Sequence, residues 1–235
     1  MSEAVGETGM VLAVEPVPPL AKRLASKARH RGMVQLQVVE AALGQTHGSA
    51  PFAWVRRAAT RSGLRARPDM TPAWRSSIER IDVSLRRLDD LAGELKLAPR
   101  FIKLDLEGGE FGALRGASAT LRKSRPMIVF ENGGQSSADL YGYSREEWFA
   151  LFESAGYSVY TLFGQAFSRE NWGTPGLPWY FLAVPAEGPE RQFLGKQLAP
   201  LILDVETWWR RSFQAFGRRW AMPTVADFKG LNGRW

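Results

Sequence analysis

Short apolar runs alternate with longer amphipathic stretches along most of this chain. The apolar runs at residues 10–14, 33–43, 101–104 and 127–130 have the length and composition of buried strands. The stretches that follow them are long enough for helices and are bounded by proline, glycine or acidic residues. Strands that alternate with helices predict a sheet with helices on both faces, so we expect a mostly parallel, doubly wound α/β fold.

The sheet is expected to end in an antiparallel pair. Ser144 and Glu147 have the spacing of a capping box for a helix over residues 145–155. Two further strands, at residues 157–163 and 179–184, are joined by a loop rich in glycine and proline that contains no helix pattern. Strands connected without a crossover helix are predicted to be antiparallel.

Further helices are predicted from amphipathic periodicity. One is a basic helix over residues 20–31. Another covers residues 89–97, follows an extended segment at residues 81–88, and has Asp89 or Asp90 near its N-terminal cap.

The strand at residues 101–104 is followed by a predicted helix over residues 110–123. Gly112 and Gly116 lie within it, and each weakens a helix by about 1 kcal/mol relative to alanine. We expect these glycines to allow close packing of the helix against the sheet.

Composition limits the classes of site that the chain can hold. Its 235 residues suit one α/β domain with an appendage. With no cysteine and only two histidines, disulfides, thiolate metal sites and histidine-rich metal sites are excluded, and no metal site is expected. No secretory signal pattern and no transmembrane segment are found in the sequence, so a cytoplasmic protein is expected. The formal charge of +7 favours anionic partners in general, but no nucleic acid is expected, because the chain has no recognisable nucleic-acid module.

Two segments carry an excess of basic residues. Between residues 44 and 80 seven arginines face two acids, Asp69 and Glu79, and Trp54 and Trp74 lie among them. This segment is interpreted either as a basic lid over an anionic substrate or as a solvated loop and helix face. The second segment is a basic, tryptophan-rich C-terminal extension at residues 186–235, expected to be helical and to follow a domain at residues 1–185. The seven arginines are Arg56, Arg57, Arg61, Arg65, Arg67, Arg75 and Arg80.

Carboxylates follow two of the predicted strands. Asp105, Glu107 and Glu110 lie at a strand-to-helix turn that contains two consecutive glycines. Ligands of open α/β sheets bind beyond the carboxyl ends of the strands, although acids at such a turn also complement the helix dipole. Glu15 ends the strand at residues 10–14, as does the acid that binds ribose hydroxyls in nucleotide-binding folds.

The stretch FIKLDLEGGEFGALRGASATLRKSRPMIVFE, residues 101–131, resembles the signature of FkbM-type methyltransferases. Their pattern here is I-K-x-D-x-E-G-x-E, then a helix with Leu and Gly-Ala, then R-P, then an apolar strand that ends in Glu. The resemblance implies a fold that binds S-adenosylmethionine (SAM). It also implies methylation of a hydroxyl on a sugar or another small metabolite. The basic segment allows an anionic acceptor, and the oligomeric state is left open.

The resemblance also implies site residues. Asp105 is the first choice for the site carboxylate, and Glu107 and Glu131 are alternates for the general base or for substrate contact. Lys103 either pairs with a site carboxylate or extends its stem to the edge of the sheet. For the cofactor, Glu15 is expected at the ribose, and Asp105, at the end of the signature strand, is expected beside the cofactor as well. Residues Glu40 and Ala41 are expected beside the adenine, unless they are an ordinary strand end.

One departure from the family pattern concerns the first strand. The ribose acid lies about 20 residues beyond the glycine-rich turn of the first strand, and counting back from Glu15 passes Met1. We therefore expect this strand and its motif to be missing from the sequence. As a consequence we expect poor stability, and SAM binding that is weak or absent. A non-catalytic relic or interaction protein is the alternative function.

Overall fold

The computed structural model describes residues 5–6, 8–162 and 164–187. Its strands are β1 (Val11–Val14), β2 (Leu36–Val39), β3 (Ala42–Leu43), β4 (Gly48–Val55), β5 (Ile78–Arg86), β6 (Phe101–Leu104), β7 (Met127–Glu131), β8 (Tyr157–Thr161) and β9 (Tyr180–Pro185). Its helices are α1 (Pro18–His30), α2 (Pro72–Arg75), α3 (Leu88–Glu94), α4 (Glu110–Arg115), α5 (Ser118–Ser124), α6 (Gly134–Tyr141) and α7 (Arg145–Ser154), with 3-10 turns at Ala59–Arg61 and Arg169–Asn171.

The strands form separate sheets, and the predicted single, mostly parallel sheet is not confirmed. β1 and β2 form a parallel pair, β3–β5–β4 form a mixed sheet, and β6–β7–β9–β8 form another. The fold is therefore mixed α/β. Two local predictions are confirmed: β6 and β7 are parallel neighbours, and β8 and β9 are antiparallel. Among the described strands, β1 and β6 each have a hydrogen-bonded neighbour along one edge only.

The prediction of one strand over residues 33–43 is wrong. β2 ends at Val39, and Ala42 and Leu43 form β3, which pairs with Leu85 and Arg86 of β5 in another sheet. Sequence periodicity does not show this change of partner, because both pieces are apolar.

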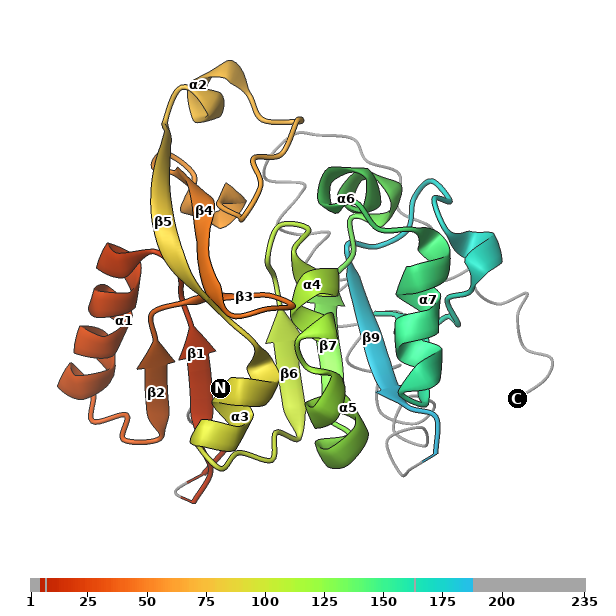
Figure 1. Ribbon diagram of the computed structural model, residues 1–235, viewed down its shortest axis with the longest axis horizontal. Helices are drawn as coiled ribbons and strands as arrows, with labels where there is room; N and C mark the ends of the chain where they lie inside the picture. Colours follow the sequence, from red (N-terminus) through yellow and green to blue (C-terminus); the bar gives the residue numbers. More distant parts are fainter. Residues whose placement is uncertain (1–4, 7, 163, 188–235) are drawn as a thin grey trace, which may run out of the picture.

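The segment from residue 44 to residue 80, which has no clear periodicity, contains a long strand that the sequence did not predict. β4 pairs antiparallel with β5 along its whole length, from Gly48 opposite Leu85 to Val55 opposite Ile78. In Figure 1 this pair rises beyond the other strands and carries α2 at its far end. The loop at residues 56–77 is thereby placed near the ends of β6 and β7.

The predicted helix over residues 110–123 is two helices, α4 and α5, which meet at Gly116 and Ala117. A Cβ on Gly116 would lie 2.0 Å from the backbone oxygen of Gly44, so this glycine allows the close contact that was expected. A Cβ on Gly112 would meet nothing within 4 Å, so the expectation is wrong for Gly112. Asp89 does not cap α3 with its side chain; its carboxylate instead accepts hydrogen bonds from the first turn of α5.

The main core lies between the β6–β7–β9–β8 sheet and the helices drawn in front of it in Figure 1. Phe130 of β7 is 1% exposed and packs against aromatic side chains of α7 and β9. The capping box of Ser144 and Glu147 at the start of α7 is confirmed. Such packing fixes the ends of β6 and β7, where the signature acids lie.

Among the described residues, no helix combines the length and the apolar character needed to cross a bilayer. The expected C-terminal extension lies outside the described residues from position 188 onward.

Candidate active site

The signature turn between β6 and α4 is tightly constrained. Glu107 has a left-handed backbone with φ of 52°, and Gly108 follows with φ of 100°. A Cβ on Gly108 would lie 2.8 Å from the ring of Tyr141, so only glycine fits without displacing that ring. The buried Glu110 accepts a hydrogen bond from the backbone N–H of Leu106 at 2.5 Å and closes the turn. The turn therefore presents Asp105 and Glu107 in fixed positions.

A cavity of about 350 Å³ extends from the end of β1 to the end of β6. Pockets for small ligands and cofactors have volumes of about 300–1,000 Å³. Four predicted site residues line it, namely Glu15, Ala41, Asp105 and Glu107. Glu40 is exposed and does not line this cavity. The remaining wall is mostly apolar and comprises Val14, Pro16, Val17, Leu20, Ala42, Leu43, Phe52, Ala59, Thr60, Ser62, Leu64, Leu106 and Gly109.

Glu15 is held at the β1 end of the cavity. One of its oxygens, Oε1, accepts a hydrogen bond from the backbone N–H of Val17 at 2.8 Å. Burial raises the pKa of Glu15 above its usual value, and the hydrogen bond from Val17 opposes that effect. The carboxylate is therefore positioned by the start of α1, and its second oxygen is not used by this bond.

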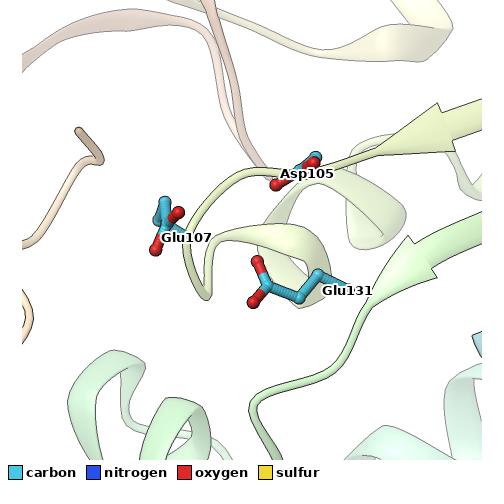
Figure 2. Close-up of side chains that lie close together, drawn as sticks. All are labelled: Asp105, Glu107 and Glu131. Carbon is cyan, nitrogen blue, oxygen red and sulfur yellow. The ribbon is translucent and has the colours of Figure 1, made fainter. Parts of the chain in front are cut away.

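Three carboxylates, which we call the acidic trio, meet beside the other end of the cavity; two of them, Asp105 and Glu107, line it, and the third, Glu131, does not. Asp105, Glu107 and Glu131 each have an oxygen within 4.8 Å of the others (Figure 2). Asp105 directly follows β6, Glu131 ends β7, and Glu107 comes from the turn between β6 and α4. The parallel pairing of β6 with β7 brings their carboxyl ends together, which explains why residues so far apart in sequence converge.

Cations from the loop at residues 56–77 face the acidic trio. Arg67 is 8% exposed; its Nη1 donates to Glu107 at 3.2 Å and lies 3.9 Å from Glu131. Its Nε and Nη2 donate to Asp69 at 3.1 and 3.2 Å. Nη1 of Arg61 lies 4.0 Å from Glu107.

Neither interpretation of the basic segment describes all of its arginines: most are exposed, as expected of a solvated face, and the two that turn inward pair with the protein's own carboxylates. Arg67 and Arg61 turn inward to the carboxylates, whereas the other arginines of the segment are exposed. The sequence showed the excess of arginine but not which side chain is buried. The exposed arginines are Arg56, Arg57, Arg65, Arg75 and Arg80.

Asp105 has two hydrogen-bond donors of its own. Lys103 Nζ and Tyr180 Oη each donate to its Oδ2 at 2.8 Å. Of the two roles considered for Lys103, the structure therefore shows pairing with a site carboxylate. Lys103 is exposed rather than buried, because β6 is covered on one face only. Tyr180 was missed from sequence; it reaches the site because it pairs with Glu131 across β7 and β9.

The three carboxyls differ in their affinity for protons. Burial raises the pKa of Glu131 to about 7, and the charges of Glu107 and Asp105 act in the same direction. Burial also raises the pKa of Glu107, although Arg67 and Arg61 oppose it. For Asp105 the effect of burial is outweighed by the hydrogen bonds from Lys103 and Tyr180, so its pKa lies below the usual value. Neighbouring carboxyls with separated pKa values are typical of catalytic sites.

Three converging carboxylates also have the chemistry of a ligand set for a hard cation such as Mg²⁺. Here Arg67 and Lys103 already provide positive charge at hydrogen-bond distance from two of the three. We therefore assign no metal to the acidic trio.

Comparisons with known proteins agree with the signature. Residues 1–159 match the family model described as the methyltransferase FkbM domain, which is more than half of the chain. A solved structure, methyltransferase FkbM from Methylobacillus flagellatus KT, aligns with 16% identity and a TM-score of 0.44. The alignment covers 78% of this chain and 42% of that one, so this chain spans less than half the length of that protein. A comparison with curated proteins found no match. On the match to the family model, this chain belongs to the FkbM methyltransferase family.

Proposed function

We propose that this chain is a SAM-dependent methyltransferase that methylates a hydroxyl on a sugar or another small metabolite. The observation that supports this most is the cavity that joins Glu15 at the end of β1 to Asp105 at the end of β6. A cofactor bound there would lie beyond the carboxyl ends of two strands, the position at which open α/β folds bind nucleotides. Asp105 and Glu107 of the acidic trio line the same cavity, and Glu131 has an oxygen within 4.8 Å of theirs, where an acceptor would have to meet the cofactor.

The residues of the cavity suit the nucleoside part of SAM. Glu15 is fixed by Val17 and has an oxygen with which to accept hydrogen bonds from ribose hydroxyls. Ala41 and Ala42 are buried and provide an apolar wall for the adenine. Glu40 is exposed, so we assign it no contact and place Ala41 beside the adenine instead.

The acidic trio suits the handling of the acceptor. SAM, when bound, supplies a methyl group on a positively charged sulfur. The chain has to orient the acceptor hydroxyl at about 3–3.5 Å from that carbon and to take its proton as the bond forms. Glu131 is the best general base, because its pKa of about 7 matches a neutral working pH. Asp105, which remains ionised, and Glu107 would accept hydrogen bonds that orient the acceptor.

Calorimetric titration with SAM tests the proposal. The sequence alone predicted weak SAM binding or none, but the cavity leads us to expect that the wild-type chain binds SAM measurably. Glu15→Ala should bind it about 10- to 150-fold more weakly, through the loss of a charged hydrogen bond worth about 1.5–3 kcal/mol. Glu146→Ala is the matched control, since Glu146 is exposed at the start of α7 and does not line the cavity. Equal affinity of wild type and Glu15→Ala would refute the ribose assignment. Absence of SAM binding to any variant would favour the alternative of a non-catalytic protein.

A further inference from the structure

The cations at the acidic trio are already engaged. Arg67 donates to both oxygens of Asp69 and to Glu107, and Lys103 donates to Asp105. Arg61 lies between Asp69 and Glu107, at 3.8 and 4.0 Å. Among the described residues, each cation that reaches the trio is therefore paired with a carboxylate there. An anionic group on an acceptor would have to displace one of these carboxylates.

The charge balance of the site also disfavours an anion. The carboxylates of the trio and of Asp69 outnumber the three cations paired with them, Arg61, Arg67 and Lys103. Carboxylate oxygens accept hydrogen bonds from hydroxyl groups, whereas they repel a phosphate or a second carboxylate. The site is therefore matched to a ligand that donates hydrogen bonds and carries no negative charge.

An exposed indole lies beside the acidic trio. The side chain of Trp179 is 51% exposed, and the guanidinium carbon of Arg67 lies 6.0 Å from its ring centroid. The carbonyl of Trp179 accepts a hydrogen bond from the N–H of Asn132 at 2.9 Å, directly after Glu131. The next residue, Tyr180, donates to Asp105. Trp179 is thus fixed by its backbone between two members of the trio, and the exposed part of its ring, which Arg67 does not cover, is available to a ligand.

An aromatic face complements the C–H bonds of a sugar ring, and nearby carboxylates complement its hydroxyl groups. The negative face of an indole attracts the polarised C–H bonds of the ring, and the carboxylates accept from its hydroxyls. We propose that Trp179 and the acidic trio form an acceptor subsite that takes an uncharged hydroxylated ring and rejects carboxylated or phosphorylated acceptors. This inference rests on the proposed methyltransferase function. It adds that Trp179 determines specificity and that the acceptor is uncharged.

Saturation-transfer NMR on the full chain at pH 8 tests the inference with simple probes. Methyl glucoside, methyl galactoside and methyl mannoside are the uncharged ligands, and glucuronate and glucose 6-phosphate are the anionic ones. We expect saturation transfer to at least one uncharged sugar and at least tenfold weaker binding of both anions. Trp179→Ala should lower the affinity for the uncharged sugar at least fivefold, whereas Trp179→Phe should retain most of that affinity.

Trp54→Ala is the matched control, because Trp54 also packs against an arginine, Arg56 at 4.4 Å, but that arginine pairs with Glu79 and not with a member of the acidic trio. Thermal unfolding of each variant verifies that it is folded. Absence of transfer to every uncharged sugar, or equal binding of the anions, would overturn the inference, as would unchanged sugar binding by Trp179→Ala. A separate SAM titration of the same samples distinguishes the two proposals. SAM binding without sugar binding would overturn the acceptor subsite alone, whereas loss of both would also count against the proposed methyltransferase function.

Discussion

Glu131→Gln isolates the cost of holding a charge at the acidic trio. The side chain of Glu131 is 12% exposed, and it lies near the ionised Glu107 and Asp105 with Arg67 at 3.9 Å as its nearest cation. Glutamine has nearly the same shape as protonated glutamate, so the substitution mimics the uncharged form. It removes the proposed general base while leaving the packing at the end of β7 in place.

The pKa of Glu131 gives the size of the effect. A rise from 4.5 to about 7 corresponds to about 3 kcal/mol of unfavourable free energy for the ionised form. Because the folded-state pKa is the higher one, the folded protein binds the proton more tightly, and its stability falls as pH rises from about 4.5 to about 7. The penalty is complete above pH 7 and absent below pH 4.5. We therefore expect Glu131→Gln to stabilise the protein by about 2–3 kcal/mol at pH 8 and much less at pH 5.

Urea unfolding at both pH values measures this difference, and methyl transfer should fall in the same variant. Glu79→Gln serves as the control, because Glu79 is 49% exposed in a surface pair with Arg56 and should change stability by less than about 0.5 kcal/mol. The reasoning would be refuted if Glu131→Gln lowered the free energy of unfolding by the same amount at pH 5 and at pH 8. Such a result would mean that Glu131 is ionised at both pH values and stabilises the protein.

Four other substitutions test separate parts of the structure by urea unfolding. Gly116→Ala should destabilise by about 1–3 kcal/mol because its Cβ would meet the backbone of Gly44, whereas Gly112→Ala, which faces open space, should stabilise by up to about 1 kcal/mol; equal effects would contradict this packing. Ser144→Ala should cost about 0.5–2 kcal/mol through the lost capping box of α7, and no loss would argue against that cap. Arg67→Met should cost about 3–5 kcal/mol at pH 8 and less at pH 5, because burial raises the pKa of Glu107 and the carboxyl left without Arg67 binds a proton more readily at low pH; a loss independent of pH would count against this explanation.

Local features were predictable from sequence because their causes are local. The strand β6, the acids after it and the capping box of α7 depend on residues within a few positions of one another. The parallel pairing of β6 with β7 followed from the short strand–helix–strand order. These features include the carboxylates of the candidate site.

Features that depend on distant partners were not predictable. The predicted strand at residues 33–43 is interrupted between Val39 and Ala42 because β3 pairs with Leu85 and Arg86 of β5. The hydrophobic pattern of the sequence does not indicate this pairing. Likewise, the burial of Arg67 depends on a loop that the β4–β5 pair carries to the end of β6. An arginine excess is visible in a sequence, but tertiary structure selects which arginine is buried against the acidic trio.

The central claim is that the cavity between the ends of β1 and β6 binds SAM. Hydrogen–deuterium exchange, followed by mass spectrometry with and without saturating SAM, tests it most directly because it locates the bound ligand on the chain. We predict slower exchange in three segments that line the cavity, residues 15–17, 41–43 and 105–109, and little change in α7. Slower exchange that is confined to other parts of the chain, or no change at any concentration of SAM, would contradict the account.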